Sequence, residues 1–434
     1  MNAKVVVPIV AFVVTILLAS SIPIPFQASA QSIPDVGQER VLVYIQTNTE
    51  KQREAISSRS DVTVRFTFDD NWISVEVPQH VKEILENRPG VLIENVSIFT
   101  IDAKKDCNDP ANSGLPQCKP KGGDEEPPPE PEPDPTREAQ PENQITWGLK
   151  KIYDNNSLDF DAVLNDNRGA GVNVAVLDTG VFKDHPDLKN KVILCKDFMS
   201  GKRPQNTCVD GHGHGTHVSG SILANGGSDK LGILGVAPGA NLFAFKVCTN
   251  GGSCFGDMIA AAIKEAERSG ANIISMSFAG SKLSTVEKNA IDNALAKRND
   301  LLFIAAAGNS GPSSNTIKYP AAYHKVVAVA AVDSSLSVAS FSSRGIDDIW
   351  QDGKDRLVEV SGPGVAVEST MNDGAYATWS GTSMATPHIS GLAANVWSLA
   401  NGDATTVRSW LQSYSNDIGP SGYDRAYGFG FPHQ

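Results

Sequence analysis

The sequence predicts an α/β protein with a mostly parallel sheet flanked by helices, preceded by a small α+β module. The main observation is a pair of near-continuous apolar runs, VNVAVLDTG at residues 172–180 and LLFIAAAGN at residues 301–309, which stop abruptly in polar residues and glycine. Strands that are buried on both faces of a sheet have this composition. Helical patterns between the runs complete a strand–helix–strand order, which requires right-handed crossovers and a parallel sheet.

Two stretches between these runs predict helices. MIAAAIKEAERSG ends in Gly270, and glycine favours the end of a helix. STVEKNAIDNALAKRN opens with Ser284 and Glu287 at the spacing of a capping box, and its apolar residues recur on one face. Both helices are therefore expected to cover the sheet.

The earlier part of the chain, residues 40–103, alternates strand and helix signals. RVLVYIQ, NWISVEV and VLIENVSIFTI are typical of strands. PQHVKEILENRPG predicts a helix that is entered through Pro78 and ends near Pro89 and Gly90. This order predicts the small α+β module.

Residues 1–30 have the composition of an export signal. Lys4 precedes an apolar run over residues 5–19, and ASA at residues 28–30 fits a signal peptidase site. A membrane anchor is the alternative, but the run is shorter than the roughly 20 residues that span a bilayer. We therefore expect a secreted, extracellular protein with no stable membrane span after signal removal.

The chain carries 37 basic and 49 acidic residues, a formal net charge of −12, which makes nucleic acid an unsuitable partner. Part of the acidic excess lies in a Pro-rich stretch, residues 122–138. This stretch belongs to a segment over residues 104–144 that is nearly devoid of large apolar side chains. We predict that the segment is a disordered linker, so its charge says little about the folded surfaces.

Six cysteines in an exported chain are expected to form disulfides. A metal site is the weaker alternative, because the chain has no CxxC pair. Other pairings are open, but the spacing favours three local ones: Cys107 with Cys118, Cys195 with Cys208, and Cys248 with Cys254.

Three histidines lie close together in GHGHGTHVSG: His212, His214 and His217. They indicate a metal site, a catalytic base with structural companions, or a polar loop. Zinc is disfavoured, because metalloprotease helices place histidine ligands at i and i+4 with a glutamate between them, and this stretch has neither feature.

Asp178 and Ser383 favour the catalytic interpretation. Asp178 ends an apolar strand, at the sheet edge where ligands bind, and a half-buried carboxylate there needs a partner such as histidine. Ser383 stands where a helical pattern begins, beside unpaired backbone N–H groups that can stabilise an oxyanion. The order Asp, His, Ser is one of the known chain orders of a catalytic triad.

Seven motifs, in order, make this sequence resemble the subtilisin-like serine proteases, the subtilases of peptidase family S8. They are VAVLDTGV, HPDL, GHGTHVSG, ILGVAPGA, AAAGN, FSSRG and GTSMATPH, and the resemblance covers roughly residues 145–431. It implies a subtilisin-like peptidase domain over residues 145–434. Residues 40–103 likewise resemble the family's inhibitory propeptide, which implies a ferredoxin-like propeptide domain over residues 31–103.

The resemblance implies roles for four residues of a secreted serine endopeptidase. Ser383 would attack a peptide carbonyl, His214 would accept its proton, and Asp178 would orient the imidazole, which gives an acyl-enzyme. Asn309 would supply the side-chain amide of the oxyanion hole. His217 is then a packing residue, and His212 a solvated or rim residue.

The resemblance also implies a substrate groove, in which an extended peptide adds as a strand. Its walls would be Ser277, Phe278, Ala279 and Gly280 beside the strand, and Ala306, Ala307 and Gly308 around the P1 pocket. Because FAG stands where the family commonly has LGG, Phe278 and Ala279 could narrow a pocket or shift the strand. Lys318 falls at the bottom of the P1 pocket, where it would favour Glu or Asp unless its ammonium group reaches solvent.

Structural Ca²⁺ is the expected ion. Asp187 in HPDL matches a common family ligand, and Asp229 lies in NGGSDKLGILG, which resembles the family's calcium loop. Hard oxygen ligands on a loop suit this ion. The loop differs in sequence from the common form, so a solvated acidic loop is the alternative.

The expected partners are protein or peptide substrates and the chain's own propeptide, acting as an intramolecular inhibitor on a monomer. The activating cut falls near residue 103, within the linker, or close to Ile145. The alternative function is a catalytically silent exported binding protein on the same fold. A lipase or esterase is disfavoured, because GTSMA lacks the GxSxG elbow.

Overall fold

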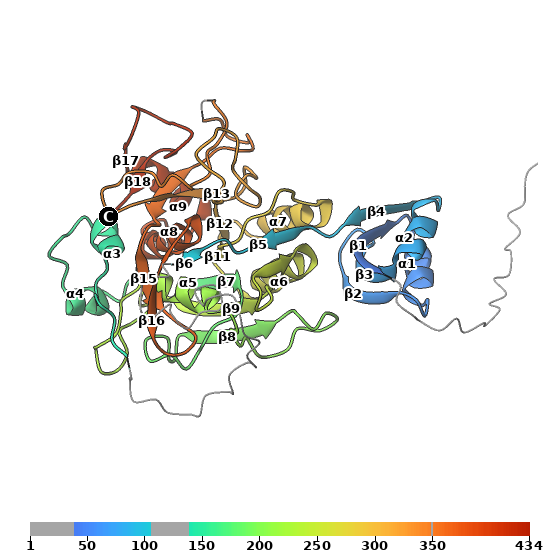
Figure 1. Cartoon of the computed structure of the whole chain (residues 1–434), viewed down its shortest axis with the longest axis horizontal. Helices are drawn as coiled ribbons and strands as arrows, with labels where there is room; N and C mark the ends of the chain where they lie inside the picture. Colours follow the sequence, from blue (N-terminus) through green and yellow to red (C-terminus); the bar gives the residue numbers. More distant parts are fainter. Residues whose placement is uncertain (1–38, 106–138, 349) are drawn as a thin grey trace, which may run out of the picture. The chain divides into compact units, whose positions relative to one another are not determined.

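The computed structural model describes residues 39–105, 139–348 and 350–434, and residues 40–434 form one unit by their contacts. At the centre lies a seven-stranded sheet in which every neighbouring pair is parallel (Figure 1). Its strands, in spatial order, are β14 (Val360–Pro363), β13 (Val327–Val332), β12 (Leu302–Ala306), β11 (Ile273–Met276), β7 (Asn173–Asp178), β9 (Asn241–Lys246) and β8 (Val192–Asp197). The predicted α/β fold with a parallel sheet is confirmed.

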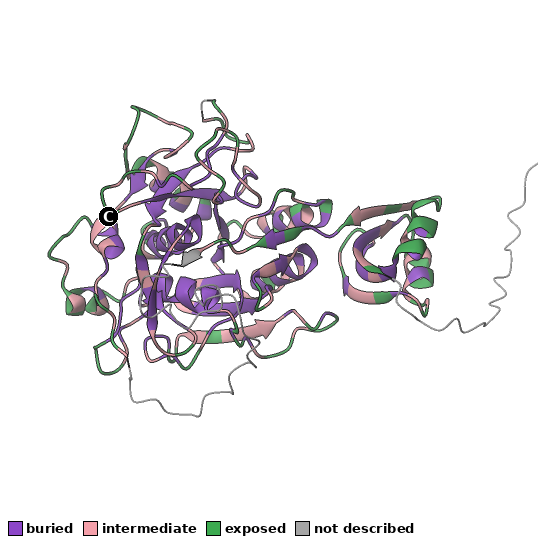
Figure 2. Ribbon diagram, viewed as in Figure 1, coloured by how far each residue is buried: buried purple, intermediate pink, exposed green. Residues whose placement is uncertain are grey.

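Helices cover both faces of this sheet. Along β7, Val174 and Val176 belong to one apolar cluster with α5 (His214–Leu223) and α8 (Thr382–Val396). The alternate residues Ala175 and Leu177 belong to the other cluster, with α6 (Gly256–Ser269) and α7 (Thr285–Lys297). The period of two along the strand thus divides the core into two layers, which Figure 2 shows as buried.

The predicted helix ends of α6 and α7 are confirmed. Gly270 ends α6 with φ 83°, in the left-handed region that favours glycine. Ser284 begins α7 with both hydrogen bonds of a capping box to Glu287. The remaining helices of this part are α3 (Trp147–Ile152), α4 (Phe160–Asn165) and α9 (Ala404–Ser413).

The N-terminal module is an α+β fold with its own core. Its elements follow the order β1 (Arg40–Thr47), α1 (Glu50–Ser57), β2 (Thr63–Thr67), β3 (Trp72–Pro78), α2 (Gln79–Glu86) and β4 (Val91–Asn95). The four strands form an antiparallel sheet in the order β2-β3-β1-β4. Val43, Ile73 and Val81 are fully buried in one cluster between the sheet and the helices.

Short strands connect the module to the rest of the chain. After β4, β5 (Ile98–Thr100) pairs with β10 (Ser253–Phe255), and β6 (Lys104–Lys105) pairs with β16 (Tyr376–Ser380). β16 also pairs with β15 (Val367–Thr370), and β17 (Ser415–Asn416) pairs with β18 (Phe431–Pro432) near the C-terminus.

Two of the three predicted disulfides are formed, Cys195–Cys208 and Cys248–Cys254. The third, Cys107–Cys118, lies outside the described residues, as do the predicted signal peptide and most of the predicted linker. Within the described ranges, no helix has the length and apolar character needed to cross a bilayer.

Candidate active site

Asp178 is the last residue of β7, and its side chain is buried. Its carboxylate accepts a hydrogen bond from the backbone N–H of Thr179 at 2.7 Å. It also contacts His214 Nδ1, with Oδ1 at 2.8 Å and Oδ2 at 3.0 Å. The partner that this buried carboxylate requires is therefore His214.

His214 is the first residue of α5 and is fully buried. Its Nδ1 faces an acceptor-only carboxylate and so carries the proton, which leaves Nε2 as the basic nitrogen. Within the described part of the chain, Nε2 is buried and has no hydrogen-bond partner. The ring stacks on Trp379 with 5.9 Å between centroids. The imidazole is thus held by its Nδ1 edge and its face, with Nε2 available.

Asp210 fixes the loop that leads into α5. Its carboxylate accepts hydrogen bonds from the N–H groups of His212, Gly213 and Thr216 and from the Thr216 hydroxyl, at 2.7–2.9 Å. Burial alone would raise the pKa of Asp210, but these hydrogen bonds lower it below its ordinary value. Asp210 is not among the residues predicted from the sequence; its place four positions before His214 was the available signal.

Ser383 is the second residue of α8 and is buried. Its hydroxyl donates to the backbone carbonyl of Ser277 at 2.9 Å, and the Ser277 hydroxyl donates to the Ser383 carbonyl at 3.0 Å. Of the two contacts expected within the triad, the structure forms the one between Asp178 and His214. Between Ser383 and His214, both of them described residues, it forms no hydrogen bond.

Asn309 follows β12, where the sequence analysis placed it. Its Oδ1 accepts from both the backbone N–H and the hydroxyl of Thr382, each at 3.0 Å. This arrangement orients the Asn309 Nδ2 group, which donates to the backbone carbonyl of Asp102. Thr382 was not predicted as a functional residue, although it directly precedes Ser383 in GTSMA.

A cavity beside Ser383 contains most of the predicted substrate-binding residues. The residues of the expected groove that line it are Ala279, Gly280, Ala306, Gly308 and Lys318, together with Asn309 and Ser383. Asp102, from the segment after β5, lines the cavity as well. Ser277, Phe278 and Ala307 are buried beside it and are not part of the lining.

Phe278 packs against the N-terminal segment. Its ring meets that of Phe99 edge to face, with 5.5 Å between centroids, and both rings are buried. The next residue, Ala279, exchanges two backbone hydrogen bonds with Thr100, at 2.9 and 3.0 Å. The FAG segment is therefore an edge on which an extended chain is already paired.

The other two histidines have different surroundings from His214. His217 is fully buried, its Nε2 lies 3.0 Å from the Ala377 carbonyl, and its ring stacks on Trp379 at 4.9 Å between centroids. Burial, with the neighbouring His214, lowers the pKa of His217 to about 3. His212 is half-buried, with its ring 6.2 Å from that of His214.

The loop over residues 225–235 wraps around Asp187. The Asp187 carboxylate is fully buried and accepts from the Tyr376 hydroxyl at 2.7 Å and the Ile233 N–H at 2.9 Å. Asp229 is exposed and accepts from the backbone of its own turn. Among the described residues there is no group of three or more His, Cys, Asp or Glu side chains that could hold a metal.

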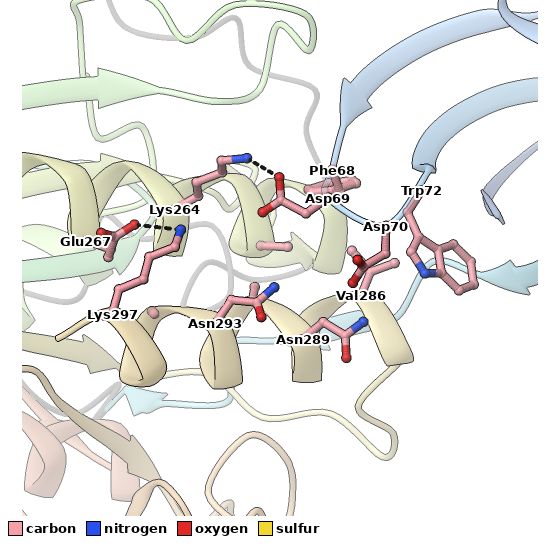
Figure 3. A pocket seen from close by; sticks show the side chains of 13 residues that line it. Phe68, Asp69, Asp70, Trp72, Lys264, Glu267, Val286, Asn289, Asn293 and Lys297 are labelled. Carbon is pink, nitrogen blue, oxygen red and sulfur yellow. Dashed lines mark hydrogen bonds and ion pairs between the residues drawn. The ribbon is translucent and has the colours of Figure 1, made fainter. Parts of the chain in front are cut away.

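A second cavity lies between the N-terminal module and helices α6 and α7 (Figure 3). Phe68, Asp69 and Trp72 line it from the module, and Asp69 forms an ion pair with Lys264 at 3.0 Å. None of the triad candidates lines this cavity. It marks the interface of the module with the two helices.

Comparison with known proteins identifies the family. The model of the subtilase family matches residues 169–430. A subtilisin from Bacillus sp. (strain TA39) is 46% identical over 309 residues, which cover 66% of this chain and 71% of that protein. Subtilisin DY from Bacillus licheniformis is 42% identical over 259 residues, 59% of this chain and 88% of that protein. The chain belongs to the subtilase family of serine proteases.

Two solved structures are similar in fold. Sphericase superposes with a TM-score of 0.62 at 44% identity and covers 67% of this chain and 99% of its own. S41 psychrophilic protease superposes with a TM-score of 0.60 at 45% identity and covers 66% and 97%. The parallel sheet with flanking helices is therefore a subtilisin-like fold, and the chain is a hydrolase whose substrates are proteins.

Proposed function

We propose that the chain is a secreted serine endopeptidase with Asp178, His214 and Ser383 as its triad, made as an autoinhibited precursor. The observation that carries this proposal is the buried Asp178–His214 pair, at 2.8 Å, with Nε2 of the ring unpartnered within the described residues. A base held in this way accepts a proton from a nucleophile. Ser383, at the start of α8, is the nucleophile.

The reaction begins when the Ser383 hydroxyl turns from the Ser277 carbonyl to His214 Nε2. His214 accepts the proton as Ser383 attacks the substrate carbonyl, and Asp178 stabilises the resulting imidazolium. Asn309 Nδ2 and the Ser383 backbone N–H stabilise the oxyanion. His214 then protonates the leaving amine, and water hydrolyses the acyl-enzyme.

Autoinhibition is supported by the path of the chain after the module. Thr100 is paired with Ala279 along the predicted substrate edge, and the Asp102 carbonyl accepts from Asn309. Substrate peptides bind proteases as added strands in the same manner. A peptide from solution cannot occupy this edge while the N-terminal segment does.

Calcium at the loop over residues 225–235 is part of the proposal. Hard oxygen atoms, which Ca²⁺ prefers, are available here from the buried Asp187 carboxylate and from the backbone carbonyls of Lys230 and Gly232. These two carbonyls accept hydrogen bonds from Gln144 Nε2 at 2.7 and 3.3 Å. Since the described residues contain no cluster of three acidic or histidine side chains, the ion would take most ligands from carbonyl oxygens. Asp229, exposed on the same loop, is a further ligand.

The decisive experiment compares the wild type with Ser383→Ala. We expect the wild type to process itself, to clear casein and to lose activity with a serine-directed acylating reagent. The variant should fold, remain full length and leave casein intact. An unprocessed wild type that clears no casein would instead favour the catalytically silent binding protein.

A further inference from the structure

We propose that the peptide bond between Asp102 and Ala103 is the first bond that the chain cuts, with Asp102 as the P1 residue of a pocket that Lys318 makes selective for acidic side chains. This inference rests on the proposed function of the site and names its first substrate. It selects one of the three cleavage positions left open by the sequence, at the boundary of the N-terminal module.

The register of the N-terminal segment in the groove is the first support. Thr100 donates to the Ala279 carbonyl at 2.9 Å and accepts from its N–H at 3.0 Å. On the opposite side, Ile101 donates to the Gly252 carbonyl at 2.9 Å. The segment is therefore an extended strand held by two edges, and its next residue is Asp102.

The contact of Asn309 selects the carbonyl. Asn309 Nδ2 donates to the Asp102 oxygen, so this carbonyl occupies the position that the oxyanion would take. A Cβ placed on Gly381 would lie 3.5 Å from the Asp102 oxygen and 3.5 Å from the Ala103 Cα. The start of α8, which carries Ser383, thus lies against the Asp102–Ala103 bond.

The chain continues beyond this bond on the leaving-group side. Lys104 pairs with Ser380 and Lys105 with Trp379, in the strand β16 that directly precedes α8. The groove is therefore filled on both sides of a single peptide bond. This is the arrangement of a substrate before cleavage.

The chemistry of the cavity favours an acidic residue. Asp102 and Lys318 line the same cavity. A Cβ on Gly308 would lie 2.6 Å from Lys318 Cγ, so the lysine stem lies along the pocket wall, and its backbone N–H is fixed to the Ala307 carbonyl at 2.9 Å. In the described part of the chain, no acidic side chain is paired with Lys318. The positive charge of the Lys318 ammonium group is therefore available to attract a carboxylate at P1.

The attraction acts through a partly solvated space. Asp102 is exposed and Lys318 half-buried, and the structure forms no ion pair between these two described residues. The selectivity that we expect is therefore the moderate one of a screened charge pair. The pocket should therefore favour acidic P1 side chains over neutral or basic ones, without a requirement for one particular side-chain length.

The step is a simple acyl transfer. Ser383 Oγ bonds to the Asp102 carbonyl carbon, the C–N bond to Ala103 breaks, and the Ser383 proton reaches the new Ala103 amine through His214. Water then hydrolyses the ester, which frees Ser383 and leaves a carboxylate at the end of the module. No oxidant, reductant or second substrate is required.

The test is the first cleavage product of the full chain, analysed by intact mass and N-terminal sequencing. We expect one fragment that ends at Asp102 and one that begins at Ala103. A first cut at any other bond, with casein hydrolysis intact, overturns this inference and leaves the proposed function standing. An intact chain without casein hydrolysis overturns both.

Charge variants test the role of Lys318. Asp102→Asn should slow the first cut by about fivefold, because the free energy of a screened charge pair corresponds to a factor of this size. Asp102→Lys should slow it by more. Lys318→Glu should partly restore cleavage of the Asp102→Lys chain, whereas Lys51→Glu, on the exposed face of α1, should not. Equal cleavage rates in all these chains would overturn the role of Lys318. They would not affect the position of the cut, which is tested separately by the masses of the fragments.

Discussion

Among single residues, Asp178 would determine which nitrogen of His214 acts as the base in the proposed triad. With an acceptor at 2.8 Å from Nδ1, the ring must present Nε2 as its base. Asp178→Asn keeps the shape but can donate a hydrogen bond to Nδ1 and so favour the wrong tautomer. We expect self-cleavage of the full chain to slow by about 10⁴-fold.

This rate is measured as the disappearance of the full-length band, which avoids the need for a processed enzyme. Asp184→Asn is the matched control, because Asp184 is exposed and, among the described residues, forms an ion pair only with Lys183, at 3.5 Å. A loss of similar size in both variants would contradict the assigned role of Asp178.

The places of the candidate site residues at the ends of strands and at the start of a helix were predictable at this scale, but their conformations were not. Asp178 and Asn309 follow apolar strands and Ser383 opens a helix, and these patterns are visible in the sequence. The direction of the Ser383 hydroxyl depends on which side-chain rotamer its surroundings in the folded chain select, so no sequence pattern reports it. The contact of Asn309 with Asp102 joins residues 207 positions apart and depends on the complete fold.

At the scale of elements, the module is held to α6 and α7 by buried polar contacts. Arg65 Nε lies 3.1 Å from Asp257 Oδ2, and Asp257 is fully buried. Tyr44 donates to the buried Glu287 at 3.0 Å. Burial raises the pKa values of Asp257 and Glu287, so each carboxylate depends on its partner across the interface.

Arg65→Ala should therefore release the module more readily after self-cleavage. Removing one partner of a buried ion pair costs about 3 kcal/mol, and we expect the lag before casein hydrolysis to shorten markedly. Arg53→Ala is the control, because Arg53 pairs with Glu50 inside the module at 2.7 Å. An unchanged lag in Arg65→Ala would mean that this ion pair does not hold the module.

The loop around Asp187 permits a second test at this scale. If Ca²⁺ joins the Asp187 carboxylate and the loop carbonyls, a ligand bound only to the folded state raises its stability. In a Ser383→Ala background, a calcium chelator should lower the Tm, and Asp187→Asn should lower the Tm and abolish the effect of the chelator. The same chelator response in Asp187→Asn would place the ion elsewhere, and no response in either chain would remove calcium from the proposal.

For the whole molecule, two buried histidines predict how stability depends on pH. Burial lowers the pKa of His217 to about 3 and that of His388 to about 4, from an ordinary value of 6.5. In the folded state both rings therefore stay neutral over a range in which the unfolded chain binds protons. Because the unfolded state then binds more protons, stability falls as the pH decreases from about 6.5 to about 4.

The raised pKa values of Asp257 and Glu287 act in the opposite sense, because these groups stabilise the fold as the pH decreases. The contribution of one histidine to the pH dependence of stability is therefore best measured as the difference between the parent and a variant that lacks it. In the Ser383→Ala background, which we expect to be inactive, His217→Gln retains a side-chain donor for the carbonyls of Val367 and Ala377 but cannot bind a proton. Its loss of Tm relative to the parent should be largest near pH 7 and shrink toward pH 4. The parent loses about 1 kcal/mol for each pH unit below 6.5 through this histidine, and the variant does not. A Tm difference that is constant from pH 7 to pH 4 would show that His217 does not titrate on unfolding.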